Sequence, residues 1–280
     1  MMEQLSIQLA NGLLVGTTIA LTALGLSLVF GILHIVNLSH GEFYMLGAYF
    51  AWAFHEWTGN FWLSVAAATL CTAVVGGALL MAFLKKMLGS GPLKWALLTL
   101  GFGFVLRELV QHIFGIDFKL VDLPVQGTLP WLGGTYRVLV MALGLVLIYL
   151  LTVFLSKTRY GLLIRAVASN AEAAAVVGVS TRKVYFMVAL ISAALAGAAG
   201  AFMLPVTSAY PTMGLEILIM AFVVVVVGGM GNIRGTLIAS LLAGELQSVL
   251  MLVAKPATAT LMALIVFMVI VVVRRSGAQS

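Results

Sequence analysis

The sequence predicts an all-α protein: a polytopic transmembrane helical bundle of about eight to nine spans with one short cytoplasmic coupling helix. Three observations predict this fold. Of the 280 residues, 62% are hydrophobic and only 9% are charged, whereas a soluble domain carries about 25% charged residues. Apolar runs of about 20 residues, the length that crosses a bilayer, recur along the chain. A charged segment with helix-capping residues interrupts these runs.

Hydropathy places the candidate spanning helices along the whole chain. In chain order they are residues 9–32, 40–57, 62–84, 94–116, 136–156, 185–205, 214–230, 235–253 and 258–273. We expect residues 1–280 to form a single transmembrane domain. Nine crossings would place the two termini on opposite sides of the membrane.

The basic residues predict the orientation of the bundle. One side receives Lys85, Lys86, Lys94, Lys157, Arg159, Arg165, Arg182, Lys183, Arg234, Arg274 and Arg275. The other side receives only Lys119, Arg137 and Lys255. Because cytoplasmic loops carry an excess of Lys and Arg, we expect residues 157–184 and the C-terminus in the cytoplasm and the N-terminus outside. The largest outer loop, at about 117–135, contains the turn residues of a partly ordered surface loop. Glu216 is expected in water at the outer mouth.

The connection between the first two helices is polar but has no Lys or Arg. Ser39 and Glu42 have the spacing of a capping box at the start of the second helix, so Glu42 is expected to be a cap and not a substrate ligand. The connection is either a tight cytoplasmic turn or a break in a discontinuous helix that lines a cavity. A break at membrane depth requires protein or water to satisfy the non-helical backbone.

The charged segment between the fifth and sixth spanning helices reads as a short helix with both ends specified. Ser169 can act as its N-cap, with Glu172 as the reciprocal acceptor of a capping box. Gly178 then supplies a left-handed stop. A membrane protein has little use for such a helix between spans unless something docks on it.

Several polar residues fall inside predicted spans, where a charge costs at least about 2.5 to 3.5 kcal/mol. Glu245 lies near mid-depth, and Arg107 and Glu108 have partners four residues on in Gln111 and His112. Each position either lines a polar path or makes a structural contact between helices. The candidate residues of a transport path are Asn37, Arg107, Glu108 and Glu245.

Small residues at four-residue spacing predict close helix packing, either within this chain or between subunits. They are Ser192, Ala196 and Gly200, and Gly12 with Gly16. The four histidines do not have the spacing of a metal site, and the single cysteine, Cys71, excludes an internal disulfide. No catalytic constellation, metal site or cofactor motif is present, so the sequence predicts neither an enzyme nor a nucleic-acid-binding protein.

Four segments of the chain resemble the branched-chain amino acid ABC transporter permeases. They are NLSHGEFYMLGAY at 37–49, IRAVASN at 164–170, AAAVVGV at 173–179 and VGGMGNIRG at 227–235. The resemblance spans nearly the whole chain and is greatest to the H-type subunit of leucine/isoleucine/valine import systems. It implies an inner-membrane permease for amino acid transport in a bacterium. It also implies docking of an ATPase on Arg165, Ser169, Asn170, Glu172 and Gly178.

The resemblance further implies two ATP-binding cassette subunits, a second permease subunit, and a periplasmic or extracellular solute-binding protein. ATP hydrolysis would occur on the partner subunits, and this chain would work by alternating access. Related permeases carry urea, short amides or other small carboxylates, so these substrates stay open. The remaining alternatives are an ion-coupled secondary transporter, a passive channel and an intramembrane enzyme.

Overall fold

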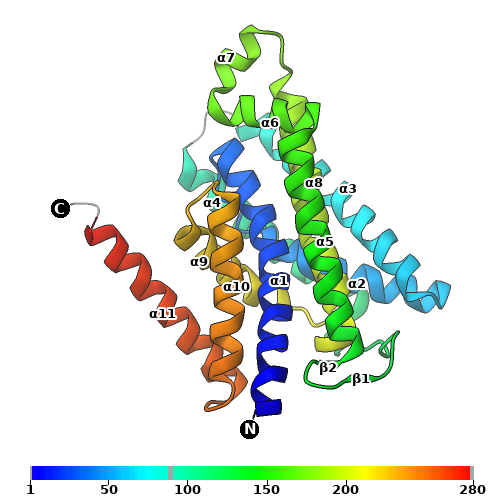
Figure 1. Cartoon of the computed structure of the whole chain (residues 1–280). Coiled ribbons are helices and arrows are strands. Elements are labelled where there is room, and N and C mark those ends of the chain that lie inside the picture. Colours follow the sequence, from blue (N-terminus) through cyan, green and yellow to red (C-terminus); the bar gives the residue numbers. More distant parts are fainter. Residues whose placement is uncertain (1, 88–90, 278–280) are drawn as a thin grey trace.

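The computed structural model describes residues 2–87 and 91–277 and confirms a helical bundle (Figure 1). Every predicted span is found as a helix, and two further short helices, α6 and α7, lie in the charged segment. In the described residues the helices are α1 (Met2–Leu33), α2 (His40–Thr58), α3 (Phe61–Met87), α4 (Pro92–Phe114), α5 (Thr135–Lys157), α6 (Arg159–Ser169), α7 (Ala171–Val176), α8 (Thr181–Thr207), α9 (Met213–Gly228), α10 (Ile233–Leu250) and α11 (Pro256–Gly277).

Four segments of the described helices are long and apolar enough to cross a membrane by length and composition: Gln4–Leu33, Phe61–Phe83, Thr135–Lys157 and Thr181–Thr207. Met213–Gly228 and Pro256–Val271 are shorter apolar helices. A run of about 20 apolar residues is the length that matches the hydrocarbon core. The chain therefore has the character of a membrane protein.

Helices α1 and α8 form the centre of the bundle. In their most apolar stretches 83% of the α1 residues and 78% of the α8 residues are buried, against 39% in α3 and 28% in α5. One apolar cluster joins α1 to α2, α3, α5 and α8. A second cluster joins α1 to α9, α10 and α11, where Ala263 and Phe267 are buried. Because both clusters include residues of α1, this helix connects the two apolar clusters.

Glycines allow the central helices to approach closely. A Cβ added at Gly244 of α10 would lie 2.2 Å from the backbone nitrogen of Gly16 on α1. A Cβ added at Gly200 of α8 would lie 1.9 Å from the carbonyl oxygen of Tyr44 on α2. The predicted small-residue faces thus pack within this chain, as such faces do in membrane bundles. Ser192 adds a hydrogen bond from its Oγ to the Gly25 carbonyl at 2.8 Å.

The connection between α1 and α2 returns into the bundle. His40, the first residue of α2, places its Nε2 2.9 Å from the carbonyl oxygen of Thr22, eleven residues before the end of α1. That is roughly 16 Å along the helix axis at about 1.5 Å per residue. The connection is therefore not a turn beyond the end of α1: it folds back inside the protein, and α2 begins beside the middle of α1.

Protein groups satisfy the non-helical backbone of this connection. The Leu38 amide donates to Thr99 Oγ1 of α4 at 3.0 Å. Asn37 Oδ1 accepts from the amide of Ser39 at 3.1 Å and from its hydroxyl at 2.7 Å. Asn37 and Ser39 are both buried. Such partners are what non-helical backbone requires at membrane depth.

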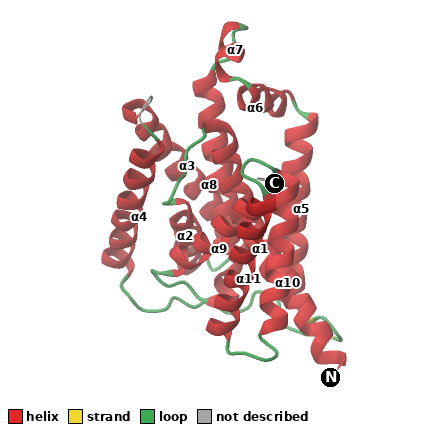
Figure 2. Cartoon of the chain, turned by 90° about the vertical axis from the view of Figure 1, so that its left-hand side faces the viewer, coloured by secondary structure: helices red, strands yellow, loops and turns green. Residues whose placement is uncertain are grey.

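The two ends of the bundle differ in structure. At one end, which we call the hairpin end, α6 and α7 extend beyond the other helices (Figure 2). The N-terminus lies at the opposite, N-terminal end. At this N-terminal end, the connection from α4 to α5 contains two short antiparallel strands, β1 (Thr128–Leu129) and β2 (Gly133–Gly134). The predicted loop at about 117–135 thus contains a short regular element, and the rest of it has no helix or strand.

Candidate functional site

The α6–α7 hairpin (residues 158–180) projects from one end of the helical bundle. Thr158 caps α6, because its Oγ1 accepts the Gly161 amide at 3.0 Å. Gly161 permits the sharp bend from α5, since a Cβ there would lie 2.3 Å from the Phe154 carbonyl oxygen. Ile164 and Val167 are buried against the bundle. The apolar side of α6 therefore covers the hairpin end.

Arg165 fastens α6 to α5. Its Nη1 donates to the carbonyl oxygen of Leu155, in the last turn of α5. A cation suits this position because the carbonyls in the last turn of a helix lack intrahelical partners and carry partial negative charge. Arg165 is thus an anchor of the hairpin as well as a basic residue at its surface.

Asn170 caps α7, which corrects the prediction for Ser169. Ser169 is the last residue of α6, so its backbone is already helical and cannot adopt an N-cap conformation. Asn170 has extended backbone angles of φ −158° and ψ 105°, and its Oδ1 accepts the Ala173 amide at 2.9 Å. Glu172 lies exposed in the first turn of α7, and the predicted capping box with Ser169 is wrong.

The predicted stop at Gly178 is confirmed. Gly178 has φ +87°, its amide donates to the Ala175 carbonyl, and the Val179 amide donates to the Ala174 carbonyl, each at 3.0 Å. These bonds satisfy the last carbonyls of α7, as a left-handed glycine cap does.

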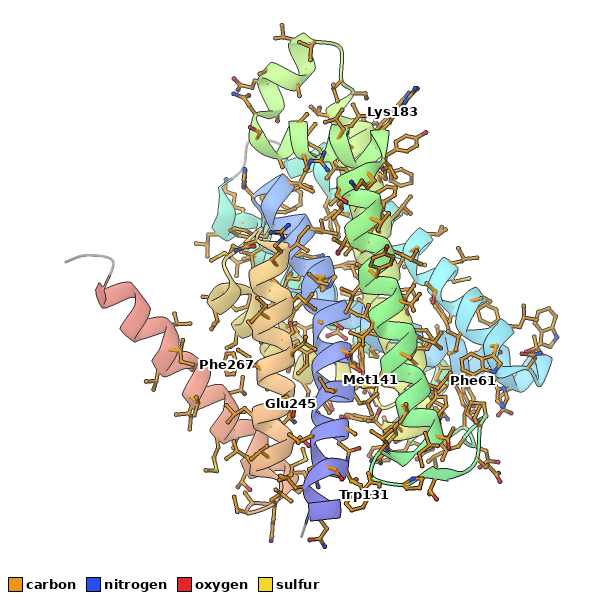
Figure 3. The ribbon with its side chains drawn as sticks, in the orientation of Figure 1. Phe61, Trp131, Met141, Lys183, Glu245 and Phe267 are labelled. Atoms are coloured by element: carbon orange, nitrogen blue, oxygen red, sulfur yellow. The ribbon has the colours of Figure 1, made fainter. Side chains whose placement is uncertain are left out.

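The tip of the hairpin exposes two adjacent apolar side chains. Val176 is 88% exposed and Val177 is 79% exposed, while Ala174 is buried. The basic residues Arg182 and Lys183 follow at the start of α8, and Figure 3 shows Lys183 at this end of the molecule. The two valines are not among the site residues predicted from the sequence. A β-branched pair directly before a helix-stop glycine, outside any predicted span, was the available signal.

We expect Asn170→Ala to destabilise α7 by about 1 kcal/mol, because the Ala173 amide loses its acceptor. Hydrogen–deuterium exchange of amides 171–176 should then become faster. Ser169→Ala is the matched control, since Ser169 makes no cap, and exchange in α7 should stay unchanged. Equal protection in the two variants would contradict the assignment of Asn170 as the cap.

The candidate transport-path residues fall in two places. Asn37 and Arg107 lie around the break between α1 and α2. Arg107 Nη2 donates to Glu42 Oε1 in an ion pair, where the side chains are 12% and 4% exposed. Glu42 is therefore a partner of Arg107 and makes no capping box with Ser39, whose side chain caps nothing. Glu108 is exposed on α4.

Glu245 lies apart from these residues, on α10 facing α1 (Figure 3). A Cβ added at Gly12 would lie 2.6 Å from Glu245 Oε2. This buried oxygen has no hydrogen-bond partner among the residues that the structure describes. The glycine thus makes the room that the carboxylate occupies between two closely packed helices.

In the described part of the chain, no group of three or more His, Cys, Asp or Glu residues could hold a metal ion. The candidate functional site is therefore a surface for binding another protein. A membrane-embedded bundle with a buried polar break at its centre ends in a projecting, apolar-tipped helical hairpin.

A family model and individual relatives of this chain point to the same kind of protein. A model of the family described as "Branched-chain amino acid transport system / permease component" matches residues 8–273. The chain is 26% identical over 259 residues to the high-affinity branched-chain amino acid transport system permease protein BraD of Pseudomonas aeruginosa, covering 86% of this chain and 84% of that protein. It is 27% identical over 261 residues to LivH of Salmonella typhimurium, covering 86% and 84%. It is 28% identical over 259 residues to LivH of Escherichia coli, covering 85% and 83%. Both LivH proteins carry the same description as BraD. No solved structure gives a significant match.

Proposed function

The chain belongs to the branched-chain amino acid transport permease family, and we propose that it is the membrane-spanning subunit of an ATP-driven importer for branched-chain or related amino acids. Family membership makes it a transport subunit and favours this reading over an ion-coupled transporter. The observation that carries the proposal is the α6–α7 hairpin. A permease driven by a separate motor needs a surface outside the bilayer where that motor binds.

We assign the hairpin to ATPase docking. Arg165 fixes its base to α5, and Asn170 and Gly178 define the two ends of α7. Val176 and Val177 offer an exposed apolar surface that a partner can bury. Burial of apolar surface is the main favourable contribution in most protein–protein association. The residues proposed for coupling are Arg165, Ser169, Asn170, Glu172 and Gly178, together with Val176 and Val177.

The orientation and the partners follow from this assignment. Residues 157–184 would face the cytoplasm, where two ATP-binding cassette subunits dock. The N-terminus and the loop at about 117–135 would face the outside of the inner membrane, where a solute-binding protein delivers substrate. A second permease subunit would complete the pathway, and residues 1–280 would act as one permease domain.

Transport would proceed by alternating access, in which closure of the ATPases moves the hairpin and rocks parts of the bundle. Coupling requires the hairpin to make different contacts with the motor in the two states, because equal contacts would shift no population. Asn37, Arg107, Glu108 and Glu245 stay candidates for the polar path.

The double substitution of Val176 and Val177 by aspartate should reduce both copurification of the ATPase subunits and ATP-driven leucine uptake at least tenfold. An unpartnered buried polar group costs about 1–3 kcal/mol, and more when charged, whereas a tenfold loss of affinity is about 1.4 kcal/mol. Pull-down of the assembled complex and uptake into proteoliposomes measure the two effects.

Val253→Asp is the matched control, because Val253 is 82% exposed in the turn between α10 and α11. It should leave assembly intact. Normal assembly and uptake by the double variant would contradict docking at the hairpin tip. Leucine uptake by this chain alone, driven by an ion gradient, would contradict the proposed function itself.

A further inference from the structure

A cavity of about 290 Å³ lies where α8 ends and α9 begins, away from the α6–α7 hairpin, which precedes the start of α8. Residues of α1, α2, α8, α9, α10 and α11 and of the turns next to α8 and α10 line it, and it is open on one side. Its volume is close to the lower limit of ligand pockets, about 300 Å³. It is therefore large enough for a small solute of a few carbon atoms.

The charge of the cavity is set by Glu216. Among the described residues that line it, Glu216 is the one charged side chain, and none is Lys or Arg. Glu216 is exposed, as expected from the sequence, and lies at the open side of the cavity. Its carboxylate attracts a cation and repels an anion. The cavity is consequently suited to a solute with an ammonium group and poorly suited to one whose charge is that of a free carboxylate.

Tyr210 orients this carboxylate. Its hydroxyl donates to Glu216 Oε2 at 2.8 Å. Burial, together with the hydrogen bond to Glu216 and the charge of Glu216, raises the pKa of Tyr210 above its ordinary value. The phenol therefore keeps its proton and remains a donor at any physiological pH.

The outer loop holds Tyr210 in place. Lys119 and Ala209 exchange two backbone hydrogen bonds, of 2.9 and 2.8 Å, next to Tyr210 in the chain. The ring of Phe118 packs on the ring of Tyr210 with centroids 5.4 Å apart. Two segments distant in sequence thus fix the position of the tyrosine and, through it, of Glu216.

The remaining walls are mostly apolar, with polar groups on α1, α2 and α8 and a pair of polar side chains on α10 and α11. Four methionines and three β-branched apolar residues line the cavity, and methionine adapts to the shape of a buried aliphatic group. Gln247 Nε2 donates to Thr260 Oγ1 at 2.8 Å. The Thr260 hydroxyl in turn donates to the Pro256 carbonyl at 3.0 Å, so the second N–H of the Gln247 amide is the group that can donate to a carboxylate, on a helix other than the one that carries Glu216.

We propose that this cavity recognises an aliphatic amino acid, with Glu216 binding its α-ammonium group, Tyr210 positioning Glu216, and the methionines receiving the branched side chain. The proposal rests on the transport function proposed above and assigns a site and its residues to recognition of the substrate. It favours amino acids over urea, short amides and small carboxylates, because among these solutes the amino acid is the one with both an ammonium group and an aliphatic side chain.

The first test compares ligands on the unmodified protein. The full chain, with its partner subunits but without solute-binding protein, is placed in lipid nanodiscs, and analogues compete with radiolabelled L-leucine. 3-Methylbutylamine, which keeps the ammonium and the branched chain, should displace leucine. 4-Methylpentanoate, which keeps the carboxylate, should be at least tenfold weaker. Equal or stronger competition by 4-methylpentanoate, or no leucine binding, would overturn the proposal.

The second test uses variants. Glu216→Gln should weaken leucine binding at least tenfold, and Glu216→Asp should retain part of it because the charge is kept. Glu56→Gln, at an exposed position outside the cavity, should bind as the unmodified protein does. Unchanged binding by folded Glu216→Gln would overturn the proposal, and the ligand comparison decides if that variant does not fold.

The two proposals fail in different ways. ATP-driven leucine uptake by the unmodified complex, with no effect of Glu216→Gln on binding or uptake, would reject the cavity and keep the importer. Absence of any ATP-driven amino acid uptake by the unmodified complex would reject the importer.

Discussion

Replacing Arg107 by methionine should lower the free energy of unfolding by about 3–5 kcal/mol, the usual cost of leaving one member of a buried ion pair alone. Arg107 on α4 donates to Glu42 on α2, and both side chains are largely removed from solvent. Without the guanidinium, the Glu42 carboxylate would remain buried among apolar groups. Helix α4, which lies at the side of the bundle in Figure 2, should then detach most easily.

Titration with sodium dodecyl sulphate in mixed micelles, followed by circular dichroism, measures this loss. Lys94→Met is the matched control, because it removes a positive charge from an exposed position of the same helix. Adding Glu42→Met to Arg107→Met should recover most of the stability, since replacing both members of a buried pair by apolar side chains is often neutral. A stable single variant, or a double variant less stable than the single one, would contradict the ion pair.

Replacing Gly200 by alanine should destabilise the protein by about 3 kcal/mol, at the upper end of the usual cost of overpacking. The new Cβ would lie 1.9 Å from the Tyr44 carbonyl oxygen and 3.2 Å from the Ala48 amide nitrogen. These are backbone atoms of α2, which cannot rotate away as a side chain can. Helices α2 and α8 would therefore have to separate.

Gly101→Ala separates this clash from the intrinsic effect of alanine. Gly101 lies in α4 with open space around its Cβ position, so the substitution should stabilise the protein by about 0.5–1 kcal/mol through helix propensity alone. The same detergent titration gives both values. If the two alanine variants were equally stable, the close contact of α2 and α8 would be wrong.

The helices themselves were predictable from local sequence. The predicted span 136–156 is found as Thr135–Lys157, and the span 62–84 is found within Phe61–Met87. The transfer of about 20 apolar residues into lipid is a sum over neighbouring residues, so a sliding window detects it. Gly178 was predictable for a similar reason, because a left-handed stop favours glycine.

The helix caps were predicted less well. Ser169 and Asn170 are both good N-cap residues, and the choice between them depends on how far α6 extends. That length is set by the packing of Ile164 and Val167 on the bundle and by the bond from Arg165 to Leu155. Neither contact is visible in the four residues of a capping-box pattern.

The sequence alone determined that this chain is a helical membrane bundle interrupted by a charged helical segment, because hydropathy, charge and the stop glycine act over a few consecutive residues. Only the tertiary structure decided that Glu42 pairs with Arg107, that α2 begins beside the middle of α1, and that Glu216 belongs to a cavity. Glu42 and Arg107 are 65 residues apart. Which polar group meets which inside a bilayer depends on how helices pack, and that packing is a property of the whole chain.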